Sequence, residues 1–226
     1  MEKGKLIVIE GTDCSGKETQ STLLVKKLNA MGLKAINLSF PMYDTPTGQI
    51  VGGPLLGRKE NGDCWFSEGP VQLDPKVFCM YLAADRKYNF PKIQEFLNNG
   101  YYVILDRYVS SNMAHQGAKI ADPDERFNLF KWIDKLEYWL LELPKADLTI
   151  FLHVPVSISK ELRNNRKSLD GNEKDDLYLQ NAELTYIELS ELYNWSRVNC
   201  SEFGKMKSIE RINEEILNIL LDFEKK

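Results

Sequence analysis

Short apolar runs alternate with helical patterns along most of the chain. Five runs are typical of β-strands and lie at Lys5–Glu10, Ala35–Phe40, Tyr101–Leu105, Leu148–Val154 and Arg197–Cys200. The first four are dense in aliphatic and aromatic residues without strict alternation, as in strands that helices cover on both faces. Helical patterns lie at Thr19–Ala30, Pro75–Asn98, Asp124–Glu142, Ser157–Asn165, Leu177–Asn194 and Ser208–Glu224. This alternation predicts an α/β fold with a five-stranded parallel sheet sandwiched by helices.

Two segments lack both patterns and are predicted to be loops. Pro46–Gly69 contains six glycines, and Lys167–Asp176 is charged and polar. The 226 residues suffice for one large domain with a buried core, so we expect a single domain over residues 1–226.

Two helical patterns carry broad apolar stripes. The stripe of the last helix favours core packing over a partner-binding groove. The other stripe consists of Phe127, Phe130, Ile133, Leu136, Trp139 and Leu140. We expect much of it in the core, and its surplus of aromatic residues leaves room for a dimer interface.

The net charge and the cysteine content indicate which kinds of partner and which cellular compartment to expect. The net charge of −4 gives no basic footprint for nucleic acid. Four widely spaced cysteines without zinc spacing suit free thiols in a reducing cytosol. No signal-peptide pattern or membrane-length apolar run is present. We therefore expect a cytoplasmic protein without a nucleic-acid or membrane partner.

A phosphate-binding loop follows the first predicted strand and precedes the first predicted helix. It has Walker A spacing and consists of Gly11, Thr12, Asp13, Cys14, Ser15, Gly16, Lys17, Glu18 and Thr19. Its backbone N–H groups and Lys17 suit the phosphates of a nucleoside triphosphate. Glu18 departs from the pattern, because a Ser or Thr whose hydroxyl binds Mg²⁺ normally follows the lysine. The carboxylate of Glu18 then either points to the metal or away to solvent.

A second candidate group follows the third predicted strand, at Asp106, Arg107 and Tyr108. Ligands of an open α/β sheet collect at the carboxyl ends of its strands, so these residues are expected to face the phosphate loop. Asp106 suits Mg²⁺ and Arg107 suits a phosphate, although a capping salt bridge would explain the same pair.

Taken together, the motifs resemble those of the thymidylate kinase family, in order and over nearly the whole chain. The matching segments are residues 11–19, Phe40–Gly48, Asp74–Val77, Ala83–Arg86, Asp106–Asn112, Gln116–Lys119 and the basic stretch Arg163–Lys167. The stretch from Asp106 to Lys119 is the most diagnostic of them.

The resemblance implies a nucleotide kinase with the P-loop NTPase architecture and a short lid at about residues 160–178. It implies ATP-dependent phosphorylation of dTMP to dTDP with Mg²⁺, and a homodimer. The implied catalytic residues are Lys17, Arg107, Arg163 and Arg166, and the implied metal ligands are Asp106 and Glu18. The implied substrate-binding residues are Asp13, Phe40, Pro41, Tyr43, Leu82, Arg86, Arg107, Ser111, Asn112, His115 and Gln116.

Several positions differ from the family pattern. Leu82 stands where an aromatic ring usually stacks on thymine, and His115 stands where a tyrosine commonly crowds the sugar. Cys14 replaces an arginine that one subgroup carries in the loop, which would shift that role to the lid arginines. Leu82 and His115 keep open a sister kinase with altered base choice. Glu18, together with Leu179 at a position where the family often has a glutamate, keeps open a regulatory module that binds nucleotide without catalysis.

Overall fold

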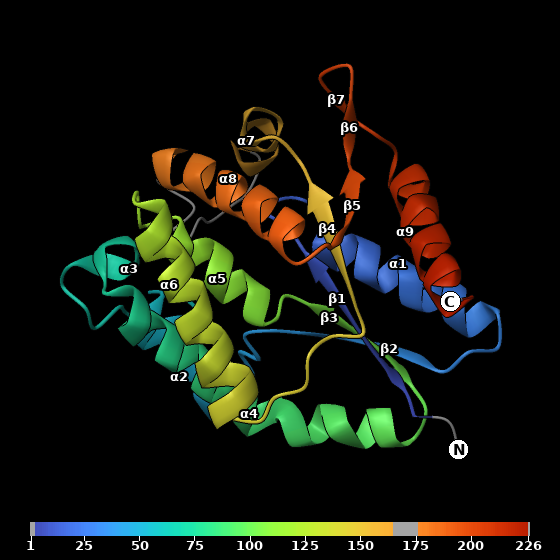
Figure 1. The fold of residues 1–226 in the computed structure, drawn as a ribbon, viewed down its shortest axis with the longest axis horizontal. Coiled ribbons are helices and arrows are strands. Elements are labelled where there is room, and N and C mark those ends of the chain that lie inside the picture. Colours follow the sequence, from blue (N-terminus) through green and yellow to red (C-terminus); the bar gives the residue numbers. More distant parts are fainter. Residues whose placement is uncertain (1–2, 165–175, 226) are drawn as a thin grey trace.

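A five-stranded parallel sheet forms the centre of the molecule (Figure 1). The computed structural model describes residues 3–164 and 176–225, and the side chains of residues 161–164 are not described. The strands are β1 (Lys5–Glu10), β2 (Ala35–Ser39), β3 (Tyr102–Asp106), β4 (Leu148–His153) and β5 (Ser196–Asn199). They are ordered β2-β3-β1-β4-β5, and every pair is parallel. The predicted α/β fold is confirmed.

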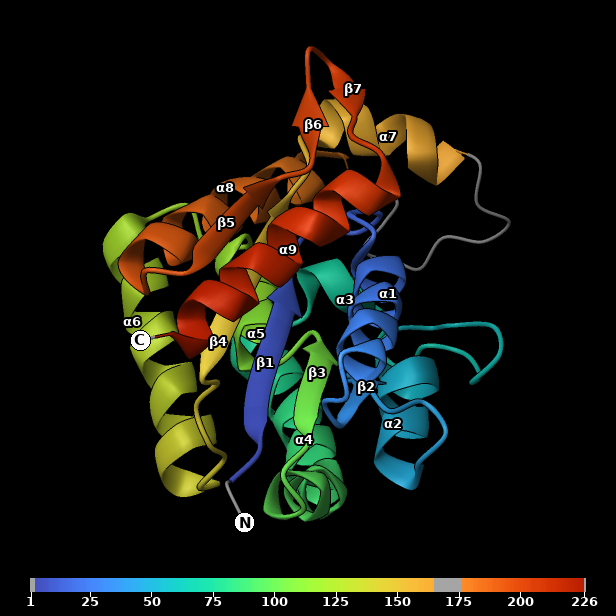
Figure 2. The ribbon, with the colours of Figure 1, turned by 90° about the vertical axis from the view of Figure 1, so that its right-hand side faces the viewer.

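Helices cover both faces of the sheet. On one face, α1 (Lys17–Ala30) and α9 (Ile209–Glu224) pack on Ile7 and Ile9. On the other, α4 (Pro75–Asn98), α5 (Val109–Gly117), α6 (Pro123–Asp134) and α8 (Asp176–Leu192) enclose Leu6 and Val8. Successive residues of β1 therefore enter opposite cores, which explains why its sequence is apolar throughout. Figures 1 and 2 show these two layers of helices from perpendicular directions.

The predicted loop Pro46–Gly69 is helical over its first ten residues, so that prediction was wrong there. α2 (Pro46–Ile50) runs into the π-helix η1 (Val51–Leu55). The side chain of Thr45 caps α2 by accepting a hydrogen bond from the N–H of Gly48, and Pro46 suits the first helical position. The buried side chains of Val51 and Leu55 anchor η1. A further short helix, α3 (Gly69–Gln72), precedes α4.

The predicted helix Asp124–Glu142 consists of α6 followed by the π-helix η2 (Lys135–Leu140). A π-turn shifts the phase of the side chains that follow it. Glu137 is consequently fully buried, while Trp139 and Leu140 are 70% and 57% exposed. The expected apolar stripe is core at Phe130 and Ile133 but surface at both ends, at Phe127 and at Trp139 and Leu140.

Helix α5 and a short hairpin were not predicted either. Helix α5 was missed because its buried face is polar and includes Ser110, Ser111, Asn112 and Gln116. A hairpin of β6 (Ser201–Glu202) and β7 (Lys205–Met206) projects from the body of the protein (Figure 2). Its turn residues Phe203 and Gly204 both have positive φ, as a tight two-residue hairpin requires.

The last helix to place is α7 (Val156–Asn164), which follows β4. Residues 165–175, which include most of the expected lid, lie outside the described part. Across residues 3–164 and 176–225, none of the helices combines the length and the apolar character of a membrane-crossing segment.

Candidate active site

The phosphate loop joins β1 to α1 as expected, and it needs glycine at two positions. A Cβ atom on Gly11 would lie 2.6 Å from Oγ of Ser15 and 2.7 Å from the carbonyl oxygen of Leu152. Gly16 caps α1 in the left-handed conformation, with φ of 84°. Both positions therefore exclude a side chain or penalise it through backbone strain.

Lys17 is the first residue of α1 and is buried against the loop. Its Nζ donates to the carbonyl oxygen of Thr12 at 2.8 Å. Burial lowers the pKa of Lys17, and the neighbouring Arg107 lowers it further. The hydroxyls of Thr12 and Ser15 are buried, and within the described part of the chain they have no hydrogen-bond partner. The loop thus holds a cation and free hydroxyl groups that suit an anionic ligand.

Arg107 connects this loop to the helices beyond it. Its backbone is left-handed, with φ of 69°, and its Nη2 donates to the carboxylate of Asp13. Its Nη1 lies 3.1 Å from Nε2 of His115 and also contacts Ser111 and Tyr186. Burial lowers the pKa of Arg107, but Asp13, Tyr186, Asp106 and Glu10 together outweigh burial, and the net shift is upward. The expectation that Arg107 faces the phosphate loop is confirmed.

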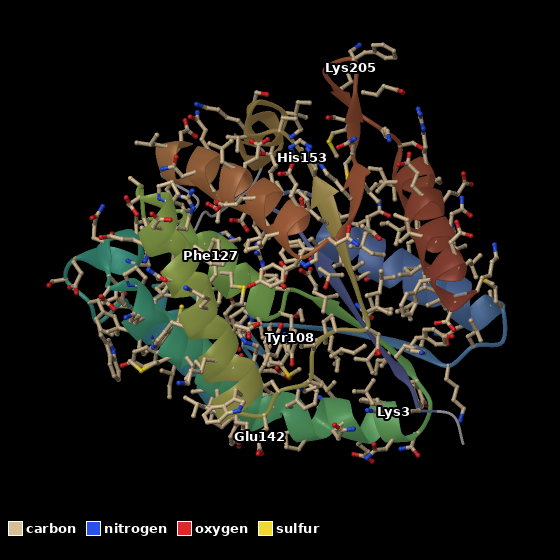
Figure 3. The ribbon with its side chains drawn as sticks, viewed as in Figure 1. Lys3, Tyr108, Phe127, Glu142, His153 and Lys205 are labelled. Atoms are coloured by element: carbon tan, nitrogen blue, oxygen red, sulfur yellow. The ribbon has the colours of Figure 1, made fainter. Side chains whose placement is uncertain are left out.

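A buried carboxylate, Glu10, organises the base of the site. It accepts hydrogen bonds from the backbone N–H groups of Tyr108 and Ser111, the hydroxyl of Ser111 at 2.6 Å and that of Tyr186 at 3.1 Å. Burial raises the pKa of Glu10. The sequence analysis missed this residue, although a charged residue ending an otherwise apolar strand was a usable signal. Tyr108, labelled in Figure 3, lies between the sheet and the helices at this point.

His115 is a neutral member of the same network. Burial and the neighbouring Arg107 lower its pKa to about 3. Because Arg107 can only donate, Nε2 of His115 must accept, and the proton lies on Nδ1, 2.9 Å from the hydroxyl of Tyr178. His115 therefore supports Arg107 and links α5 to α8.

The two expected metal ligands lie at different places. Asp106 ends β3, and its charge acts on both Lys17 and Arg107. Glu18 is exposed on the first turn of α1. Among the described residues there is no cluster of three His, Cys, Asp or Glu side chains suited to a metal. Asp106, as the expected ligand close to Lys17 of the phosphate loop, fits Mg²⁺ that arrives with the nucleotide's own phosphates.

The segment after β2 is held in place by Asp85. The carboxylate of Asp85 accepts from the N–H of Met42 at 3.0 Å and from the hydroxyl of Thr47 at 2.7 Å. Phe40 is buried and packs near Tyr108, and a cis peptide bond joins it to Pro41. The guanidinium of Arg58, which the sequence analysis did not select, lies 4.1 Å from the centre of the Tyr43 ring.

A second polar group lies between α4, α5 and η2. Arg86 is buried and donates from Nε and Nη2 to the carboxylate of Glu137, at 2.5 and 2.6 Å. The Nδ2 of Asn112 donates to the same carboxylate at 3.0 Å. Both amide atoms of Gln116 and the Oδ1 of Asn112 are buried with no partner in the described residues. Such free amide groups indicate a place for a polar ligand edge.

The apolar side of this group contains Leu82. It packs on a cluster with Phe78, Val51 and Leu55, and Phe66 joins the same cluster. Tyr81, which neighbours Leu82, contacts the edge of the Phe66 ring at a centroid distance of 5.9 Å. An aromatic ring is therefore present in this cluster, although Leu82 itself supplies none.

The two expected lid arginines lie at and beyond the C-terminal end of α7. Arg163 lies on α7 with its side chain undescribed, and Arg166 lies outside the described residues. The start of α7 is anchored, because Glu183 accepts from the N–H of Val156 at 2.8 Å and contacts His153 at 2.9 Å. His153 is the last residue of β4 and is labelled in Figure 3.

Comparison with known proteins agrees with this geometry. The family model described as thymidylate kinase matches residues 9–216. A thymidylate kinase of Homo sapiens is 31% identical over 218 residues, which cover 95% of this chain and 88% of the human protein. That of Brachyspira hyodysenteriae is 30% identical over 219 residues, covering 96% and 94%.

Solved structures give the same result. The structure of a thymidylate kinase from Candida albicans matches with a TM-score of 0.70 and 28% identity, covering 98% of this chain and 93% of that chain. The chain belongs to the thymidylate kinase family of enzymes, as its motifs indicate.

Proposed function

We propose that this chain transfers the γ-phosphoryl group of ATP directly to dTMP, with Mg²⁺, and so produces dTDP. One observation carries the proposal: a continuous series of side-chain contacts joins the phosphate loop to the polar group around Arg86. Arg107 touches both Asp13 of the phosphate loop and Ser111 of α5. The next residue, Asn112, meets Arg86 at Glu137. Phosphate-binding and base-binding groups thus follow one another along α5.

The donor nucleotide is assigned to the phosphate loop. Residues 11–19 supply backbone N–H groups, and Lys17 exchanges the Thr12 carbonyl for phosphate oxygens. The lid arginines Arg163 and Arg166 fold over the reacting phosphates and exclude water, which would otherwise compete as the acceptor.

The acceptor is assigned to the neighbouring groups. Arg107, Tyr43 and the segment at Phe40 and Pro41 bind its phosphate, and Asp13 contacts the sugar or phosphate. The remaining contacts to the base and sugar are assigned to Leu82, Arg86, Ser111, Asn112, His115 and Gln116. A guanidinium donor and an amide acceptor match the O4 and N3–H of thymine.

The reaction requires little beyond the positioning of the two nucleotides and the neutralisation of their negative charge. An anionic oxygen of dTMP forms a bond to the γ-phosphorus while the bond from that phosphorus to the bridging oxygen breaks, and ADP leaves. No strong general base is needed, because the attacking oxygen carries no proton. Asp106 would hold Mg²⁺, with Glu18 the other candidate, and the bound metal would neutralise charge on the phosphates.

A panel of nucleoside monophosphates tests the proposal. ADP formation is measured with ATP, Mg²⁺ and each of dTMP, dUMP, dCMP, AMP, CMP and GMP. We expect dTMP to be the best substrate and dUMP a weaker one. Equal or faster turnover of AMP, CMP or GMP would overturn the assignment of base.

Two other functions each have an observation in their favour. Leu82 supplies no ring to stack on a base, which favours a sister kinase with altered base choice. The exposed Glu18, in place of a metal-binding hydroxyl, favours a regulatory module. The substrate panel distinguishes the sister kinase, which would prefer another base. ATP binding measured by calorimetry, without phosphoryl transfer to any monophosphate, would indicate the regulatory module.

The oligomer and the compartment belong to the same proposal. The exposed surfaces of Phe127, Trp139 and Leu140 suit a homodimer interface in a cytoplasmic enzyme. Light scattering should give twice the chain mass, and Trp139→Asp with Leu140→Asp should reduce it to the mass of one chain. A wild-type chain of single mass would contradict the dimer.

A further inference from the structure

Glu137 joins two side chains that come from different helices. It lies in the π-helix η2 and is fully buried. Its Oε1 accepts from Nη2 of Arg86 on α4 at 2.6 Å and from Nδ2 of Asn112 on α5 at 3.0 Å. Its Oε2 accepts from Nε of Arg86 at 2.5 Å. No motif of the family resemblance includes this residue.

The contacts of Asn112 leave its amide only one orientation. Its nitrogen faces the Glu137 carboxylate and, at 3.3 Å, the carbonyl oxygen of Cys79. Both neighbours can only accept hydrogen bonds, so the NH₂ group must face them. The Oδ1 therefore faces away, buried and without a partner in residues 3–164 and 176–225.

The contacts of Arg86 with Glu137 likewise leave one donor group of the guanidinium, Nη1, available. Glu137 occupies its Nε and Nη2, and among the described residues Nη1 makes no hydrogen bond. The Glu137 carboxylate also cancels the charge of the buried guanidinium. Arg86 and Asn112 are together left with a neutral pattern of one donor group and one acceptor.

We propose that Glu137 is a positioning residue for base selection: it holds Asn112 with its oxygen, and Arg86 with its Nη1, toward the base of the acceptor nucleotide. The inference rests on the proposed function. Thymine and uracil offer O4 as an acceptor and N3–H as a donor, which complement this pattern. Cytosine offers the reverse at both atoms, so a donor would meet a donor and an acceptor would meet an acceptor.

Glu137→Gln tests the role with almost no change in volume. Its amide brings an NH₂ group against Arg86 or Asn112, so Asn112 is no longer forced into one orientation. We expect the ratio of kcat/KM for dTMP to kcat/KM for dCMP to fall at least about tenfold, the cost of one mismatched hydrogen bond. KM for ATP should stay unchanged. Glu188→Gln, which alters the Arg126–Glu188 pair outside the site, is the matched control and should preserve the ratio.

A purely structural role gives a different result. It would lower thermal stability, and the rates with dTMP and dCMP would fall together at a constant ratio. A constant ratio in folded Glu137→Gln overturns the inference.

Should Glu137→Gln fail to fold, Glu137→Asp keeps a negative charge near Arg86 while withdrawing the carboxylate from Asn112. The ratio should fall in that variant as well, and a constant ratio, or loss of folding there too, counts against a role in selection. A wild-type enzyme that phosphorylates none of the pyrimidine monophosphates would instead overturn the proposed function, independently of Glu137.

Discussion

The two ends of the candidate site, which the proposed function assigns to the phosphates and to the base, differ in how their positive charges are paired. At the phosphate end, Lys17 donates to a loop carbonyl and Arg107 pairs with the partly exposed Asp13, both partners that a ligand can replace. At the base end, the guanidinium of Arg86 is locked to Glu137, with side chains 3% and 0% exposed. Among the described residues, the fully buried side-chain atoms without a hydrogen-bond partner there belong to the neutral amides of Asn112 and Gln116.

This difference matches the two parts of a nucleotide. Two phosphate groups repel each other, so the phosphate end needs cations that are free to turn toward them. A base has no charge but a fixed pattern of donors and acceptors, so the base end needs immobile neutral dipoles. We therefore expect the paired charges at the base end to hold donors and acceptors in place, and those at the phosphate end to move onto the phosphates.

The largest expected effect concerns stability at the base end. Glu137→Leu leaves Arg86 as an unpaired buried charge, and we expect the free energy of unfolding to fall by about 3–5 kcal/mol. Adding Arg86→Met should recover much of that loss, because no buried charge remains. Urea denaturation of both variants measures this. A single variant as stable as wild type would mean that the pair is not a closed structural unit.

At the phosphate end, the large effect should appear in catalysis instead. Lys17→Met removes the positive charge beside the transferring phosphoryl group. The activation free energy should rise by about 3 kcal/mol, so kcat should fall roughly a hundredfold. Stability should change little in comparison. Lys26→Met, on the exposed face of α1, is the control and should keep full activity. Unchanged kcat in Lys17→Met would remove this lysine from the mechanism.

An intermediate effect is expected from His115 and depends on pH. Its folded pKa of about 3 lies below the unfolded value of 6.5, so the unfolded chain binds the proton more readily. The stability it contributes is complete above pH 6.5 and is lost as pH falls toward 3, by up to about 1.4 kcal/mol per pH unit. His115→Gln should flatten the pH dependence of unfolding over this range. An identical slope in the two proteins would contradict a half-buried histidine that stays neutral.

The smallest effect is expected far from both ends. Phe203, at the hairpin tip, is 96% exposed. Phe203→Ser should change the free energy of unfolding by less than about 0.5 kcal/mol and leave kcat unaltered. Thermal melting and the dTMP assay measure both. A clear loss in either would show that the hairpin belongs to one of the two functional ends.

The phosphate end was largely predictable from the sequence, because a glycine loop, its lysine and the Asp106–Arg107 pair are close together in the chain. The strands were predictable because their burial on both faces leaves continuous apolar runs. Helix α5 was not, since its inward face carries amides and hydroxyls that mask the helical period.

The base end was predictable only in part. The family resemblance identified Arg86 and Asn112 as candidate site residues. It did not indicate that both donate hydrogen bonds to the same oxygen of Glu137. Glu137 sits in an apparently continuous amphipathic helix, where a glutamate is ordinarily solvated. Only the π-turn of η2 rotates it inward, and side-chain periodicity does not reveal such a turn. Roles assigned to Arg163 and Arg166 remain predictions.

The adjacency of Ser111 and Asn112 on one short helix has a consequence for how mistakes are rejected. Any tilt of α5 that accommodates an ill-fitting base also shifts the hydroxyl that contacts Arg107 and Glu10. A wrong monophosphate would thus be penalised at its far end, where alignment with the donor is lost. Discrimination should then appear in the rate of turnover more than in the strength of binding.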